Sequence, residues 1–358
     1  MKYRTLGRTG LQVSEIGFGA WGIGNTSWVG ADDSNSIRAL VAARDAGVNF
    51  FDTALVYGRG HSERLLMQAF GKSKDIVVAS KVPPRDGRWP AQSGVPLREA
   101  FPKWYVLECL RKSLGNLHRE VIDLYQFHVW SDEWATDPQW LETLDEIRRS
   151  GQVRFIGISV NDHQPANCIQ ALKTGLIDSI QVIYNLFDQS PEDRLFPYCL
   201  EHNIGVIARV PFDEGSLTGT IQPGTIFPEG DFRNRYFRGG RKRQVWERVR
   251  RLASDADIET AQLPDLALRF CLSHQAVTTI IPGMRTSAHV RSNVAASDHG
   301  SLAGKLLSKL RSHRWDRNFY DPPATWRTRI ELSMRSVSQK VLRTRVTSRS
   351  TQDVRRSL

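Results

Sequence analysis

Short apolar runs recur between residues 14 and 283, and polar or glycine-containing segments separate them. The runs are rich in β-branched and aromatic residues, and they are too short for buried helices. Continuous apolar character without alternation is typical of strands that are buried on both faces of a parallel sheet. We therefore predict eight strands, in the runs SEIGFG, VNFFDTA, DIVVASK, VIDLYQFH, VRFIGIS, SIQVIYN, IGVIARV and AVTTIIPG.

Segments with helix signals lie between these runs. SNSIRALVAARDAG has an early serine and a terminal glycine, and QWLETLDEIRRSG has arginines in its last turn. Alternating strands and helices indicate βαβ units. Eight units favour a closed (β/α)₈ TIM barrel over an open doubly wound sheet, because no G-x-G-x-x-G sequence follows an early strand.

Three segments depart from a bare barrel. YRTLGRTGLQVSEIGFG predicts a short N-terminal hairpin ahead of the first strand. PPRDGRWPAQSGVPLREAFP extends the loop after strand three, and the long run from DEGSLTG to GGRKRQ follows strand seven. Active-site loops of a barrel emerge at the C-terminal ends of its strands. We therefore expect both extended loops to cover the substrate.

The composition changes near Tyr320, so we predict a barrel domain over residues 1–320 and a basic C-terminal extension over 321–358. The extension has nine Arg and Lys against three Asp and Glu, which is more than half of the net charge of +11. One interpretation is a flexible tail. The other is a basic amphipathic helix, with an apolar stripe of Ile330, Met334, Val337 and Val341, that contacts an acidic partner or a membrane surface.

The remaining composition excludes several classes of protein. No run reaches the roughly 18 apolar residues of a membrane span, and the N-terminus lacks a secretory signal. The four cysteines are scattered singly, so we expect no metal site and a cytoplasmic protein. GGRKRQVWERVRR is basic, but its helical pattern and lack of stacking aromatics indicate a solvated helix start and no nucleic-acid site.

Polar side chains end three consecutive strands. Asp52 ends the second, Lys81 the third and His128 the fourth, while Tyr57 lies in the loop after Asp52. Taken singly, they also suit a turn cap, a surface lysine and a core histidine. Together they make an acid catalyst, because a nearby cation lowers the phenol pKa, ordinarily near 10, by about 1 to 3 units. Asp52 would hold Lys81, and His128 would hydrogen-bond a carbonyl.

The sequence resembles the aldo-keto reductase superfamily over about residues 2 to 320. The motifs are FFDTALVYGRGHSERLL, VVASKV, VIDLYQFH, GISV, SIQVIYN, VIARVPFDEGSLTG and VTTIIPGMRTSAHVRSN, in that order. The resemblance implies reduction of an aldehyde or ketone by NADPH, with Tyr57 as proton donor. It assigns Lys81 and Asp52 to tuning of the phenol, and His128 to orienting the carbonyl. The cofactor would supply the hydride.

The resemblance also implies cofactor and substrate residues. Each has a structural alternative: a strand cap, a ladder-facing side chain, an exposed arginine or a core aromatic. The implied set is Ser159 and Gln181 for the nicotinamide carboxamide, Pro282 and Gly283 for phosphate, Arg285 for a 2′-phosphate, Asn293 for adenine, and Trp21 and Trp130 for the substrate pocket.

Four positions depart from common family patterns. Val160 replaces an asparagine that often follows the carboxamide-binding serine, which leaves Asn161 as a candidate substitute. Arg209 replaces an aromatic, and we expect it to lie against the nicotinamide or contact the pyrophosphate. His289 and Ser292 stand where many NADP-preferring members have Arg and Glu. We therefore expect NADPH as cofactor, with NADH as the alternative and His289 near the adenosine.

Two rival functions remain at this stage. Lys81 in a barrel is also suited to a Schiff-base lyase or aldolase, although a carboxylate partner keeps a lysine protonated. The second rival is a cofactor-binding regulatory subunit with little turnover, since some relatives of the superfamily serve channels. In both, the fold prediction is unchanged.

Overall fold

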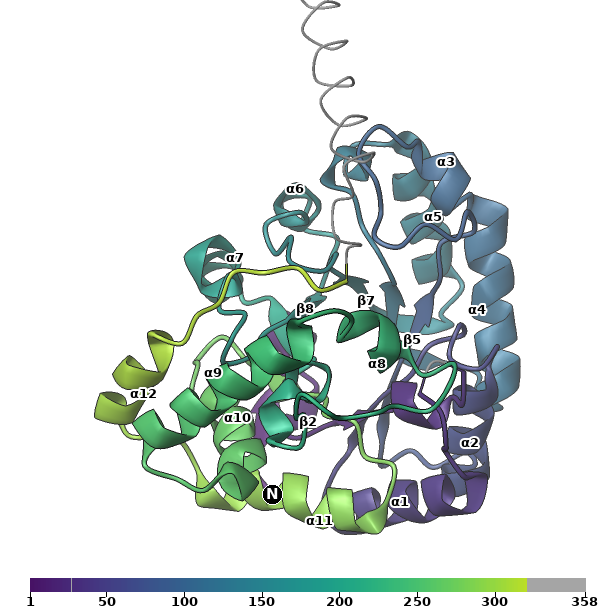
Figure 1. Ribbon diagram of the computed structural model, residues 1–358. Coiled ribbons are helices and arrows are strands. Elements are labelled where there is room, and N and C mark those ends of the chain that lie inside the picture. The colour runs from purple at the N-terminus through teal and green to yellow at the C-terminus, as the bar shows by residue number, and fades with distance from the viewer. Residues whose placement is uncertain (27, 321–358) are drawn as a thin grey trace, which may run out of the picture. The chain divides into compact units, whose positions relative to one another are not determined.

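The computed structural model describes residues 1–26 and 28–320, and Figure 1 labels its elements. Its larger sheet has eight strands in chain order, and each hydrogen-bonded pair is parallel. The strands coincide with the eight predicted runs. They are β3 (Phe18–Gly19), β4 (Phe50–Asp52), β5 (Val77–Val82), β6 (Ile122–Phe127), β7 (Val153–Ser159), β8 (Ser179–Ile183), β9 (Gly205–Arg209) and β10 (Thr279–Ile280).

The sheet closes between its first and last strands. Ile16 forms a parallel bridge with Ile280, and Gly19 forms another with Gly283. The Gly17 amide also donates to the Ile280 carbonyl at 2.8 Å. Closure leaves no unpaired edge between these strands. The predicted (β/α)₈ barrel is therefore confirmed, and the C-terminal strand ends meet at one mouth.

Helices connect the strands and surround the sheet (Figure 1). In α5 (Pro138–Arg149), the Asp137 side chain accepts from the Gln139 amide, and Pro138 occupies the first turn. Trp140, Leu144 and Ile147 share its buried face. The other helices are α1 (Asp33–Asp45), α2 (His61–Phe70), α3 (Leu97–Ala100), α4 (Lys103–Leu117), α6 (Ile169–Lys173), α7 (Pro191–Glu201), α8 (Phe232–Tyr236), α9 (Arg241–Ala256), α10 (Leu263–Leu272), α11 (Ser287–His299) and α12 (Gly304–Arg311).

The predicted N-terminal hairpin consists of β1 (Tyr3–Thr5) and β2 (Gln12–Ser14), which pair antiparallel. It closes the N-terminal end of the barrel, where Leu6 and Val13 join a core cluster with Phe50 and Ile207. At Gly7, with φ of +49°, an added Cβ would meet the Gly205 amide nitrogen at 2.3 Å, so only glycine fits there. The hairpin thus leaves the C-terminal mouth as the open end.

The chain divides into a unit Met1–Arg317 and a unit Asn318–Leu358. The boundary near Tyr320 between a barrel domain and an extension stays a prediction. The predicted basic extension from 321 to 358, including its Ile330 to Val341 stripe, lies outside the described residues. Within the described part of the chain, no helix is long and apolar enough to cross a membrane.

Candidate active site

A buried ion pair lies at the C-terminal ends of β4 and β5. The Lys81 ammonium donates to Asp52 Oδ2 at 2.6 Å and to the Thr53 carbonyl at 2.7 Å. Both side chains are almost completely buried. Burial lowers the pKa of Lys81, while the adjacent Asp52 carboxylate opposes this shift. The Lys81 ammonium and the Asp52 carboxylate therefore neutralise each other in the protein interior.

Two glutamines hold the second oxygen of Asp52. Gln181 Nε2 donates to Asp52 Oδ1 at 2.8 Å, and Gln126 Nε2 donates at 3.3 Å. Gln126 pairs in register with Lys81 across β5 and β6, and it is fully buried. The amide nitrogen of Gln181, which the resemblance implies as a carboxamide contact, is thus engaged inside the barrel. The carboxylate accepts from an ammonium on one oxygen and from two amides on the other.

Tyr57 lies in the loop after β4, beside this pair. The Lys81 ammonium is 5.1 Å from the centroid of the phenol ring, and the His128 ring is 5.5 Å from it. Burial raises the pKa of Tyr57 above its ordinary range, and Asp52 adds to the increase. This direction is opposite to the lowering expected from Lys81. The reason is that burial of the phenol is the largest effect on its pKa, and the Asp52 carboxylate acts in the same direction.

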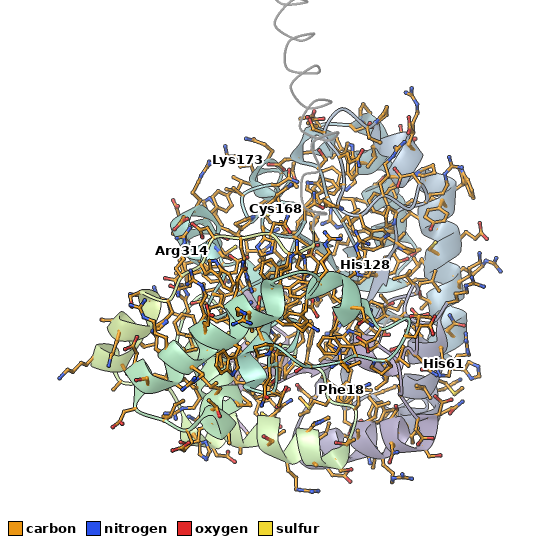
Figure 2. The ribbon with its side chains drawn as sticks, in the orientation of Figure 1. Phe18, His61, His128, Cys168, Lys173 and Arg314 are labelled. Atoms are coloured by element: carbon orange, nitrogen blue, oxygen red, sulfur yellow. The ribbon has the colours of Figure 1, made fainter. Side chains whose placement is uncertain are left out.

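His128 follows β6, and its amide donates to the Val82 carbonyl at 3.1 Å. Figure 2 shows it well inside the ring of helices, whereas His61 lies at the rim. Its ring packs edge-on against Trp89 at 4.7 Å. Its Nδ1 is buried and makes no hydrogen bond within the described residues. Burial, then Lys81 and Arg209, holds the pKa of His128 well below its ordinary value.

A neutral His128 is therefore expected across the physiological pH range. Because its pKa lies below the ordinary value near 6.5, the folded protein should not protonate it between about pH 8 and 6. NMR of the imidazole nitrogens would follow the protonation state of His128, and the variant His128→Gln would assign its signal. A His128 resonance that titrates at about 6.5 or above would contradict the geometry.

Aromatic side chains surround the Tyr57 ring at the mouth. Trp21, from the 3₁₀ turn after β3, lies 6.5 Å from Tyr57 and 5.4 Å from Phe232 of α8. Trp89, in the extended loop after β5, is 48% exposed while it contacts His128. Both extended loops thus reach the mouth, as expected. Sequence reasoning missed Trp89 and Phe232, although aromatic residues within long polar loops were a usable signal.

Trp130 is placed differently from this aromatic group. Its side chain is fully buried, and it packs against Trp134 at 5.6 Å and Trp140 at 5.0 Å. The loop after β6 thus turns its indole toward α5, where it packs as a core aromatic. The substrate-pocket role of Trp130 stays a prediction.

Arg209 ends β9 and binds the loop after β7. Its Nη2 donates to Asp162 at 2.6 Å and to the Val160 carbonyl at 3.1 Å. The next residue, Val210, has φ of +56°, an unusual conformation for a β-branched side chain. Such outliers are found where surrounding structure fixes them, frequently beside active sites. The charge of Arg209 acts on both Tyr57 and His128.

Asn161 is held by structural contacts. Its Oδ1 accepts from the amides of Ala91 and Trp130, at 3.2 and 3.3 Å. Its Nδ2 donates to the Ala91 carbonyl and to Gln164. All four hydrogen-bonding positions of the amide are therefore used, and Asn161 does not substitute for the asparagine that Val160 replaces.

The loops after β3, β9 and β10 bring two arginines together around Trp28. Arg285 donates to the Val29 carbonyl at 3.1 Å. Its guanidinium is 5.9 Å from the Trp28 ring, and that of Arg233 is 4.6 Å from the same ring. Asp231 offsets the charge of Arg233 through contacts of 2.8 and 2.9 Å. Sequence reasoning missed Arg233 and Trp28, since only the folded loops bring them to Arg285.

The other predicted cofactor residues lie at the end of β7, in the loop after β10 and on α11. Gly283 is exposed, and an added Cβ there would meet no atom within 4 Å. No protein atom therefore crowds the position at which the Gly283 backbone is predicted to face phosphate. Pro282 is buried beside it. Ser159 and Asn293 are buried. His289 is exposed and its amide donates to Thr286, the cap of α11.

A cavity of about 430 Å³ lies between the loops after β5, β6 and β7, beside the catalytic candidates rather than among them. Its carboxylates are engaged: Asp132 accepts from the amides of Gln170 and Ala171, and Glu133 accepts from that of Gly94. The described residues contain no cluster of three His, Cys, Asp or Glu arranged for a metal.

The fold and this set of side chains agree with one family of oxidoreductases. Residues 15–314 match the model of the Aldo/keto reductase family, and the chain belongs to it. It is similar to the aldo-keto reductase YhdN of Bacillus subtilis, with 32% identity over 65% of this chain and 69% of that protein. A probable voltage-gated potassium channel subunit beta of Oryza sativa is 28% identical over 83% of this chain and 92% of that one.

A solved structure extends the comparison to the fold. The holo form of aldo-keto reductase AKR11C1 from Bacillus halodurans has a TM-score of 0.69 and 28% identity, and it covers 90% of this chain and 100% of that chain. The chain is thus an NAD(P)H-dependent oxidoreductase of the aldo-keto reductase family, and the enzyme class implied by the sequence motifs is confirmed.

Proposed function

We propose that this protein reduces the carbonyl of an aldehyde or ketone to an alcohol with NADPH, and that Tyr57 donates the proton. The observation that carries the proposal is the buried Asp52–Lys81 pair, with Tyr57 and His128 in contact beside it at the open mouth. The bound cofactor supplies the hydride. The protein supplies a proton and a hydrogen-bond donor.

The raised pKa of Tyr57 suits this role at neutral pH. The phenol stays protonated, so its proton is available when negative charge develops on the carbonyl oxygen. The alkoxide that forms is a stronger base than a phenolate, which makes the transfer favourable. Lys81, held over the ring by Asp52 and Thr53, stabilises the phenolate that remains. Neutral His128 donates a hydrogen bond to the same carbonyl oxygen.

The residues beside the mouth fit a dinucleotide. Ser159 and Asn293 are buried polar groups, and we assign them to the nicotinamide amide and the adenine. We assign Pro282 and Gly283 to the backbone that faces phosphate, His289 to the adenosine end and Arg209 to the nicotinamide side. Gln181 faces the same end of the barrel, where it positions Asp52.

We further propose that Arg285 gives NADPH preference over NADH. Arg233 and Arg285 both contact Trp28, and a 2′-phosphate with nearly two negative charges would pair with a guanidinium there. Because the site also has His289 in place of a cation, we expect the lower half of a roughly 10- to 150-fold preference in affinity.

Fluorescence titration of both cofactors tests this preference. Arg285→Ala should weaken NADPH alone, whereas Arg291→Ala, an exposed arginine of α11, is the matched control and should change neither. Equal affinities of the wild type for the two cofactors would refute the preference, and NADH would then be the cofactor.

The aromatic mouth supports a carbonyl substrate with an apolar portion. Trp21, Trp89 and Phe232 present ring surfaces around Tyr57 and His128, and such rings bury apolar groups at little conformational cost. Trp89→Ala should raise KM for aromatic aldehydes more than for small aliphatic ones. An equal effect on both classes would contradict this role.

One rival function rests on a specific observation. Similarity to a probable potassium channel subunit beta supports a cofactor-binding subunit with little turnover. The Schiff-base alternative is weakened by the Asp52 contact, which favours protonated Lys81, and borohydride trapping with a carbonyl substrate tests it.

We also propose a cytoplasmic location. All four cysteines are free and buried, as is common in reducing compartments.

A further inference from the structure

Positive charge is concentrated in two segments of the barrel unit. Residues 232–254 contain nine Arg and Lys and one acidic residue, and α12 contains three basic residues and no acidic ones. In the rest of residues 1–317, 28 basic residues are outnumbered by 34 acidic ones. The barrel therefore has a basic side, and its positive charge does not depend on the extension.

The basic side consists of the outer faces of α9 and α12. These helices pack against each other, and Figure 1 shows them side by side. Val245, Val249 and Leu252 turn the other face of α9 into the core. The exposed cations, which we call the α9–α12 surface, are Arg243, Arg250, Arg251, Lys305, Lys309 and Arg311.

Most of this charge is available to a partner. Arg251 pairs with Asp255 only at 3.7 Å and its side chain stays 82% exposed. Arg311 pairs with Glu192 at 3.4 Å and stays 57% exposed. Such exposed pairs contribute little and are readily exchanged for a partner's charge.

An apolar side chain projects at one end of the surface. Ile226 is 91% exposed, while its neighbour Phe227 is buried and stacks on Phe237 at 5.7 Å. Lys242, in the first turn of α9, donates to the Thr225 carbonyl at 2.7 Å, which fixes Ile226 beside the basic helix. Packing thus holds a large apolar group in solvent next to cations.

We propose that the α9–α12 surface docks the enzyme on an anionic lipid bilayer, with Ile226 entering the interfacial region. Clustered cations attract anionic headgroups, and an adjacent apolar side chain adds burial that a phosphate backbone does not provide. A nucleic acid is disfavoured because Trp246, the aromatic of α9, lies half-buried with Arg250 4.8 Å above its ring, and it offers no stacking platform.

Sedimentation of the full-length protein with vesicles tests the proposal. The vesicles contain phosphatidylcholine with or without phosphatidylglycerol. Binding should require phosphatidylglycerol and weaken with salt. A triple variant should weaken vesicle binding by at least about 100-fold, since each cation near the membrane surface contributes about fivefold to affinity. It carries Glu in place of Arg243, Arg250 and Arg251. Ile226→Ser should weaken vesicle binding about three- to tenfold. Reductase turnover in solution should be unchanged in the triple variant and in Ile226→Ser.

A control variant with the same change in net charge distinguishes binding by the α9–α12 surface from an effect of net charge alone. Arg38, Arg111 and Arg149 are exposed on α1, α4 and α5, and their replacement by Glu should weaken binding much less. An equal loss in the control would overturn the proposal, as would full binding by the α9 variant, which would assign binding to the extension. Duplex DNA binding that depends on α9, with no effect of Ile226→Ser on vesicles, would identify a nucleic-acid surface instead.

Discussion

Replacing Tyr57 by phenylalanine should lower kcat by about 10² to 10⁴ and leave cofactor affinity nearly intact. The change removes one hydroxyl, while the ring keeps its contacts with Lys81, Trp21 and His128. Steady-state rates and cofactor titration measure the two effects. Because the pKa of Tyr57 is raised, wild-type reduction should also show no alkaline limb from this phenol below about pH 10.

Tyr198→Phe provides the matched control for this experiment. Tyr198 is on the outer helix α7, away from the mouth, and its hydroxyl makes no contact with the candidate site. Its loss should leave turnover unchanged. If Tyr57→Phe also turned over at the wild-type rate, the proton would come from another group, and the proposed mechanism would be wrong.

Replacing Lys81 by methionine should both inactivate the enzyme and destabilise the fold. The change leaves the Asp52 carboxylate buried with only Gln126 and Gln181 as partners. Breaking a buried pair by removal of one partner typically costs about 3 to 5 kcal/mol. Urea unfolding of the variant, compared with wild type, measures this loss in the free energy of unfolding.

The double variant Lys81→Met with Asp52→Asn distinguishes charge from packing. Asparagine keeps an oxygen that accepts from the glutamines and removes the unpaired charge, so stability should recover substantially while activity stays low. Asp52→Asn alone should also destabilise the fold, because it leaves the Lys81 ammonium buried and unneutralised. Equal stability of Lys81→Met and the double variant would show that the pair's electrostatics do not matter.

The barrel could be predicted from sequence because buried parallel strands leave a strong signal. Runs such as VIDLYQFH and SIQVIYN are apolar without alternation, and they are short. The strand order also follows chain order in a barrel. The positions of Asp52, Lys81 and His128 at strand ends therefore predicted one common mouth, and the structure brings them together with Tyr57.

Contacts that depend on folded loops could not be predicted in this way. Trp89 on His128, and Arg233 on Trp28, join segments that are distant in sequence. The direction of the Tyr57 pKa shift depends first on burial of the phenol and then on the Asp52 carboxylate, and residue spacing does not give the extent of burial. Gln126 left one signal, a polar residue within a buried strand, but its contact with Asp52 required the register of β5 and β6.

The most direct test of the account is turnover of NADPH with a broad panel of aldehydes and ketones, followed by cofactor absorbance. The proposed mechanism predicts NADPH oxidation that depends on the carbonyl, with the alcohol as product and with kcat lowered by about 10² to 10⁴ in Tyr57→Phe. Tight cofactor binding without turnover across the panel, or turnover that survives in Tyr57→Phe, would contradict it.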